Sequence, residues 1–336
     1  MKRWGAGRLL ATCATGALLW ALVAAGCLCV GSTGSFGWPD HIVFAYRLEV
    51  VLVASLVGAA LGAAGVVYQA ILRNPLADPY LLGVSSGASL LSLLWYVGIL
   101  ATRAAPIQAA GQQAFAFAGA LLSITVVFLV SSRRGRLDPV TLILVGVIVN
   151  AVNGSIYLLI FFRHPELVSR GGEFTFLVGG IQTNLTRQQE WAAAACSGAG
   201  WLGLAYLAGQ LNVAPLGEAE AQALGVHIHR LRWVALVLAS VITASVVAIS
   251  GPIGFVGLIC PHLGRLIVGR DQRRLLPTAT ALAAALLAIA DAASRYLSQE
   301  SLLRTQLPVG VLTGLLGGPF FLLLLWRNRR AGGGLM

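Results

Sequence analysis

Charged side chains are scarce in this sequence. Only 10% of the 336 residues are Asp, Glu, Lys or Arg, whereas a soluble domain carries roughly 25%. Hydrophobic residues make up 57% of the chain. This composition excludes an ordinary water-exposed domain and indicates a chain that lies mostly in lipid.

Lysine is almost absent, and that absence bears on ATP. Lys2 is the only lysine, and a phosphate-binding P-loop needs the pattern G-x-x-x-x-G-K-[ST]. We therefore expect no P-loop, no ATP hydrolysis and no enzymatic activity from this chain. If ATP drives its activity, ATP and Mg bind to a separate ATPase subunit.

Metal-ligand and catalytic arrangements are also missing from the sequence. The five cysteines lie within or beside apolar segments, and no two histidines have the spacing of a metal site on one helix. No nucleophile–base pair falls within the apolar segments. We therefore expect no bound cofactor and no metal, and an intramembrane enzyme is disfavoured.

Ten apolar segments are present, bounded by charged residues or by Gly/Pro clusters. The bilayer core is about 30 Å thick, so a helical span needs about 20 apolar residues. The sequence thus predicts an all-α membrane protein, a single polytopic domain over residues 1–336. Its ten helices are expected near 9–30, 48–72, 83–101, 110–131, 139–162, 190–209, 232–250, 254–268, 276–297 and 308–326. The eighth is short, and the first has a signal-like basic start but is long enough to remain as an uncleaved span.

Basic residues set the predicted orientation. A net charge of +11 could indicate nucleic acid, but these residues form short clusters between apolar runs, which is typical of a multi-pass protein in a lipid bilayer. Sixteen of the 23 fall on the side of the termini and seven on the other. This predicts cytoplasmic termini, and the longest external loop, about 163–189, contains a predicted short helix at 174–181.

Three segments carry candidate functional residues. Prolines and Asp78 end the second helix, and small residues open the third, so Asn74, Pro75, Ser85 and Ser86 form either a gate or a structural turn. On the fifth helix one face carries Gly146, Asn150, Asn153 and Tyr157. Amides are costly in lipid, so this face either lines a pathway or hydrogen-bonds to neighbouring helices.

The third segment, about 211–230, is expected on the cytoplasmic side between the sixth and seventh spans. Pro215, Glu218 and Gly225 favour a short helix there. Its small side chains would let it sit in a cleft of another protein, although a plain surface loop is the alternative. The candidate contact residues are Leu216, Gly217, Glu218, Ala219, Ala221, Leu224 and Gly225.

Four stretches in order resemble the bacterial permease family that imports iron-siderophores, haem and cobalamin. They are residues 73–88, 216–225, 251–262 and 307–321. The resemblance implies the type II ABC importer permease fold, with ten helices per subunit in a homodimer around a central pathway. It also implies two ATP-binding-cassette ATPase subunits that contact segment 216–225, a soluble substrate-binding protein, and the bacterial inner (cytoplasmic) membrane.

The same resemblance makes Arg47 and Arg295 candidates for docking the binding protein. Glu49 and Val50 stand where the family has Pro-Arg, so one expected docking charge is absent. Asp291 lies four residues before Arg295, and an internal ion pair is therefore the competing role.

The expected function is that of the permease of a binding-protein-dependent importer, with a self-sufficient secondary transporter of a small solute as the alternative. The favoured cargo is a ferric siderophore or haem, followed by cobalamin, and an oxyanion such as molybdate stays open.

Overall fold

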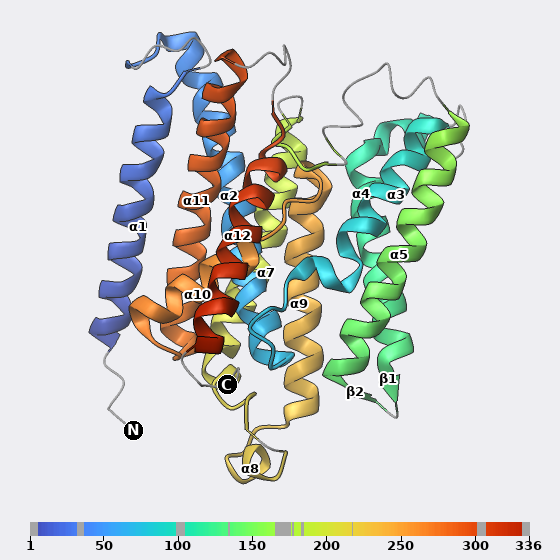
Figure 1. Cartoon of the computed structure of the whole chain (residues 1–336), viewed down its shortest axis with the longest axis vertical. Coiled ribbons are helices and arrows are strands. Elements are labelled where there is room, and N and C mark those ends of the chain that lie inside the picture. Colours follow the sequence, from blue (N-terminus) through green and yellow to red (C-terminus); the bar gives the residue numbers. More distant parts are fainter. Residues whose placement is uncertain are drawn as a thin grey trace.

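The chain folds into a bundle of helices in a computed structural model that describes residues 6–31, 37–98, 105–133, 135–164, 176, 178–182, 185–216, 218–300 and 307–330 (Figure 1). The elements are α1 (Ala6–Cys29), α2 (His41–Ile71), the 3-10 helix η1 (Pro79–Leu82), α3 (Val84–Val97), α4 (Ala105–Ser131), β1 (Ser132–Arg133), β2 (Arg136–Leu137), α5 (Pro139–Arg163), α7 (Arg187–Leu211), α8 (Glu218–Ala223), α9 (Ile228–Ser250), α10 (Val256–Val268), α11 (Gln272–Glu300) and α12 (Val309–Arg330).

Each of the ten predicted apolar segments corresponds to a helix. Within the described part of the chain, seven helices are long and apolar enough to cross a membrane, and α3, α10 and α12 contribute shorter apolar stretches. The short eighth segment is α10, with 13 residues. Helix α2 begins at His41, earlier than the predicted residue 48, because Arg47 interrupts the apolar run and sets the predicted boundary.

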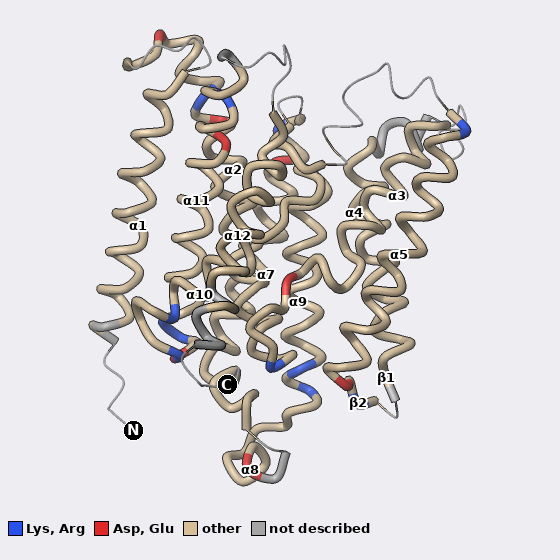
Figure 2. The backbone as a smooth tube through the Cα atoms, in the orientation of Figure 1, with Lys and Arg blue, Asp and Glu red and all other residues tan. Residues whose placement is uncertain are grey.

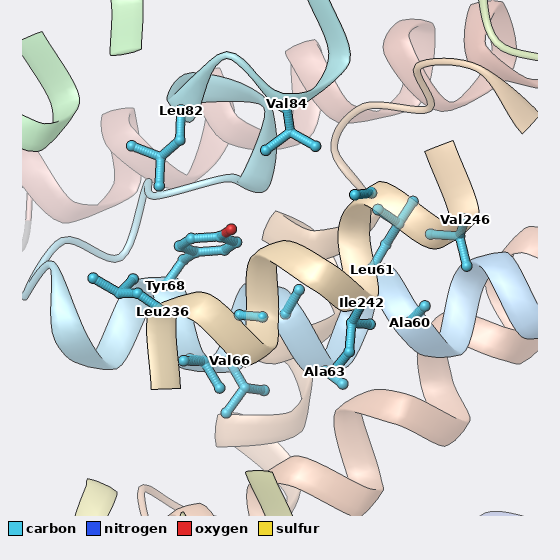
Figure 3. Close-up of a cluster of buried hydrophobic side chains, with 14 of the residues drawn as sticks. Ala60, Leu61, Ala63, Val66, Tyr68, Leu82, Val84, Leu236, Ile242 and Val246 are labelled. Atoms are coloured by element: carbon cyan, nitrogen blue, oxygen red, sulfur yellow. The ribbon is translucent and has the colours of Figure 1, made fainter. Parts of the chain in front are cut away.

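Helices α2 and α9 form the centre of the bundle. Within their most apolar stretches, 83% and 72% of the residues are buried, against 0% in α1 and 11% in α5. The Tyr68 side chain of α2 lies beside Leu236 of α9 (Figure 3), and its hydroxyl is 2.9 Å from Ser240 Oγ. The peripheral helices α1 and α5 lie at opposite edges of the bundle (Figure 1).

One end of the bundle collects most of the basic residues of the described chain (Figure 2). Helix α8, the β1–β2 pair, the first residues of α1 and the last of α12 lie at this same end (Figure 1). This arrangement agrees with the predicted common side for both termini and for segment 211–230. The antiparallel β1–β2 pair, in which Ser132 faces Leu137, was not predicted.

In the predicted short helix at 174–181, residues 174, 175 and 177 lie outside the described residues; Phe176 and Val178 are helical, and 179–181 are not. The described part of that loop forms backbone hydrogen bonds with two other segments of the chain. Gly180 N donates to Ser250 O at 2.9 Å, and Gly310 N donates to Gly179 O at 2.8 Å. The loop therefore contacts the end of α9 and the start of α12.

Candidate translocation pathway and coupling segment

A cavity of about 420 Å³ opens between η1, α3 and α5. Hydroxyl and amide groups interrupt an otherwise apolar wall. The lining residues are Tyr80, Leu81, Ser85, Ser86, Ser89, Asn150, Gly154, Tyr157, Leu158 and Pro252. A second cavity of the same volume lies between α1, α2, α7 and α11, and its wall contains none of the predicted site residues. The first cavity is therefore the candidate pathway.

The polar face of α5 is held against η1 and α3. A Cβ atom at Gly146 would lie 2.1 Å from Leu81 O, so only glycine permits this approach. Asn150 Nδ2 donates to Tyr80 O at 2.9 Å. Asn153 Nδ2 donates to Ser86 Oγ at 3.1 Å and to Ser123 Oγ at 2.9 Å. The amides thus make the interhelical hydrogen bonds of one interpretation. Asn150 and Tyr157 also line the cavity, and a role of this face in a pathway stays a prediction.

The residues predicted as a gate separate into two groups. Ser85 and Ser86 line the cavity, and Ser86 Oγ also donates to Gly83 O at 3.1 Å. Asn74 and Pro75 do not line it and belong to the turn after α2. There Leu76 N donates to Asn74 Oδ1 at 2.9 Å, which is the local turn geometry expected of an asparagine.

Sequence reasoning missed several residues around this cavity. Ser89 follows Ser85 by one helical turn and lines the cavity with it, a spacing that was available as a signal. Asp78, which the sequence placed at the end of the second helix, is buried and accepts a hydrogen bond from Tyr80 N at 3.0 Å, which fixes the start of η1. Pro252 reaches the wall from the α9–α10 connection, which no sequence pattern in α3 or α5 reveals.

Helix α8 stands at the basic end of the bundle (Figure 1). Ala221 is fully buried and anchors α8, whereas Leu224 is 62% exposed and Leu216 is 37% exposed. Gly225 has φ of 76°, a left-handed conformation that ends the helix as predicted. Gly217 and the side chains of Glu218 and Ala219 lie outside the described part of the chain. The exposed leucines leave an apolar surface on this segment.

Arg47 and Arg295 are buried, at 7% and 6% exposure. Arg47 Nη1 donates to Leu28 O at 2.8 Å, at the end of α1. Arg295 Nε donates to Asp291 Oδ2 at 2.9 Å. The structure thus shows the internal ion pair for Arg295, and docking by either arginine stays a prediction that would require these contacts to open.

The family is settled by comparison with known proteins. The model of the FecCD transport family matches residues 12–327. The chain belongs to the FecCD transport family. As members of this family are transport permease components, the chain is a multi-pass membrane permease of an ABC importer.

Individual relatives agree with that membership. The chain is 37% identical to the cobalamin import system permease of Halobacterium salinarum, over 86% of this chain and 75% of the relative. It is 36% identical to the hemin transport system permease of Yersinia pestis, over 89% and 86%. A solved structure assigned to the metal-chelate type of ABC transporter, in an inward-facing conformation, shares 30% identity and a TM-score of 0.80, with 94% of this chain and 98% of that one covered.

Proposed function

We propose that this chain is the membrane-spanning subunit of a binding-protein-dependent importer that moves a metal chelate, with an iron-siderophore or haem favoured and cobalamin next. It would act as a homodimer with two ATP-binding-cassette ATPases and a soluble binding protein in the inner membrane. The observation that carries the proposal is the FecCD membership of a chain with a cavity between η1, α3 and α5, whose mostly apolar wall carries hydroxyl and amide groups.

The homodimer is supported by the surface of α5. Only 11% of its most apolar stretch is buried within the subunit. Leu144, Ile148 and Leu159 are 60%, 53% and 71% exposed on this helix, next to the cavity wall. A second copy seated here would enclose the cavity between two subunits.

A metal chelate is supported by the relatives and the solved structure, which are named for cobalamin, hemin and metal chelates. The first two differ by one percentage point in identity, so similarity alone does not choose between them. Among the described residues that line it, the cavity offers hydroxyls and one side-chain amide and no charged side chain. Such a wall suits a large ligand that is released rather than held.

The test is uptake by the complete complex in proteoliposomes. The permease, its ATPase and its binding protein would be reconstituted together, and uptake of a ferric siderophore, haem and cobalamin compared with and without ATP. We expect ATP-dependent uptake of an iron chelate or haem. Uptake that persists without the ATPase would instead support a self-sufficient secondary transporter.

A further inference from the structure

Arg73 joins two parts of the chain that the sequence keeps far apart. It directly follows the turn that ends α2 and precedes Asn74 and Pro75. Its Nε and Nη2 donate to Ala214 O at 3.3 and 3.2 Å, and Nη2 also donates to Leu216 O. The two acceptors belong to the connection between α7 and α8, so one guanidinium links the α2 turn to the start of the coupling segment.

The backbone at Arg73 is set for this contact. Its φ of 50° lies in the left-handed region, which only one other non-glycine residue of the described chain, Phe255, adopts. Residues with a Cβ rarely occupy that region. A guanidinium presents its donors in a rigid planar fork, which suits two carbonyls two residues apart better than an ammonium does.

The residues that follow Arg73 lead to the cavity wall through a series of local hydrogen bonds. Ala77 N donates to Asn74 O at 3.0 Å, and Asp78 accepts from Tyr80 N at 3.0 Å. Tyr80 lines the cavity, and its carbonyl accepts from Asn150 of α5. Tyr80, a residue of the wall, therefore lies seven positions after Arg73, whose guanidinium binds the α7–α8 connection.

The α7–α8 connection is also fixed from its other side. Asn212, at the end of α7, donates through Nδ2 to Asp271 Oδ1 at 2.8 Å and accepts from Gln272 N at 2.8 Å. A displacement of α8 would thus act on the contact to the α11 start, on the packing of α8 against α9 and on the contact to Arg73. The Arg73 contact leads directly into the turn before η1.

We propose that Arg73 is a positioning residue that transmits movement of the coupling segment, about 211–230 and including α8, to the cavity wall at Tyr80–Ser86. Arg73 touches neither cargo nor nucleotide and acts through the two carbonyls and the turn. This inference rests on the proposed function, because it requires an ATPase that moves α8.

The first test separates transmission from assembly. Arg73→Ala, Arg73→Lys and the control Arg136→Ala, an exposed arginine of β2 at the same end of the bundle, would be purified with the ATPase and reconstituted. We expect Arg73→Ala to keep hydrolysing ATP while the cargo moved per ATP falls about five-fold or more, the lower range for coupling between sites. The cargo moved per ATP should lie between the Arg73→Ala and wild-type values for Arg73→Lys, and should equal the wild-type value for Arg136→Ala. An unchanged ratio in Arg73→Ala would overturn the proposal, as would an equal fall in Arg136→Ala.

A readout that needs no cargo follows the wall directly. Ser86→Cys, in a chain whose five native cysteines are replaced by alanine, places a thiol on the cavity wall. ATP should change its rate of modification by a small thiol reagent in the wild-type background and leave it unchanged with Arg73→Ala. The same ATP response in both backgrounds would overturn the proposed role of Arg73 and leave the proposed function untouched. No ATP response even with Arg73 present would count against the proposed function, and with it against this inference.

A covalent tether keeps the proposal testable if Arg73→Ala fails to fold. In the cysteine-free chain, Arg73→Cys with Leu216→Cys can be joined by a short thiol cross-linker. Because the contact is proposed to make the two segments move together, the cross-linked protein should recover cargo movement per ATP that the unlinked pair lacks. Cross-linking that leaves this ratio low would overturn the proposal.

Discussion

Two oppositely charged side chains, Asp291 and Arg295, lie one helical turn apart inside the external half of α11. Arg295 Nε lies 2.9 Å from Asp291 Oδ2, and both side chains are buried. Removing one partner of a buried ion pair leaves an uncompensated charge and costs about 3–5 kcal/mol, whereas an apolar replacement of both is often close to neutral. We therefore expect Arg295→Met to lower the melting temperature of the purified protein more than the double variant Asp291→Leu/Arg295→Met does.

The control for this pair is Arg47→Met, since Arg47 is equally buried but bonds to a carbonyl. A double variant no more stable than Arg295→Met would show that the arginine acts mainly through Val30 O, its other acceptor at 3.5 Å. Binding-protein affinity measured on the same variants would test the predicted docking role.

The two asparagines of α5 should behave differently. Asn153 bonds to hydroxyls of α3 and α4 and does not line the cavity, whereas Asn150 does. Side-chain hydrogen bonds between membrane helices contribute about 0.6–1.7 kcal/mol each. Asn153→Ala should thus lose about 1–3 kcal/mol of stability, while Asn150→Ala should lose less stability and more uptake. Equal effects on both measurements would contradict this division.

At the scale of elements, the sequence predicted where helices lie better than what their side chains touch. Apolar length and breakers located all ten segments, because each span must satisfy its own backbone hydrogen bonds in lipid. The face shared by Gly146, Asn150, Asn153 and Tyr157 also followed from helical spacing. The partners of that face did not, since Tyr80 O and Ser123 come from segments 30 to 70 residues away. Arg73 was noted as a basic residue and as the first residue of the 73–88 stretch, but no local pattern indicates its bonds to Ala214 and Leu216.

Helices α2 and α10 meet through a glycine. A Cβ at Gly65 would lie 1.8 Å from Gly257 O, a backbone atom that cannot move aside alone. Overpacking of a close contact costs about 1–3 kcal/mol and occasionally more. Gly65→Ala should therefore destabilise the protein by about 3 kcal/mol, measured by thermal unfolding in lipid nanodiscs. The matched control is Gly198→Ala in α7, where nothing lies within 4 Å, and it should be neutral or slightly stabilising.

Helix α5 begins at a cap that titrates. The Thr141 hydroxyl and backbone N–H donate to Asp138 Oδ2 at 2.6 and 2.8 Å, and these bonds hold the pKa of the Asp138 carboxyl below its ordinary value. A lowered folded-state pKa stabilises the protein above the unfolded pKa of about 3.9 and loses that effect as pH falls through the folded value. Asp138→Ala should thus cost about 1 kcal/mol at neutral pH.

The measurement for Asp138 is the difference in melting temperature between wild type and Asp138→Ala across pH. The difference should shrink below about pH 4. Asp138→Asn keeps a capping oxygen without a titrating group, so its melting temperature should stay closer to the wild type at neutral pH. A wild-type advantage over Asp138→Ala that persists undiminished at low pH would mean that the hydroxyl contact, not the charge, carries the cap.

For the whole molecule, the distribution of basic residues fixes a direction across the membrane. The described arginines gather at the end that carries α8 (Figure 2), and the positive-inside rule places that end in the cytoplasm. An ATPase can reach α8 only if that end is cytoplasmic, so the proposed coupling role requires this orientation. His41, at the start of α2, and Gln222, on α8, are exposed at the two opposite ends and can report the direction.

Single cysteines at these positions, in a chain without its five native cysteines, give the test. A membrane-impermeant thiol reagent should modify His41→Cys in right-side-out vesicles and Gln222→Cys only in inside-out vesicles. The reversed pattern would place α8 outside and remove it from any cytoplasmic ATPase.

Addition of the purified ATPase to inside-out vesicles should then slow modification of Gln222→Cys, because the exposed face of α8 would be covered, and leave modification of Arg136→Cys unchanged. Slowing at both positions would indicate general crowding of the surface, whereas slowing at Gln222→Cys alone would locate the ATPase contact on α8.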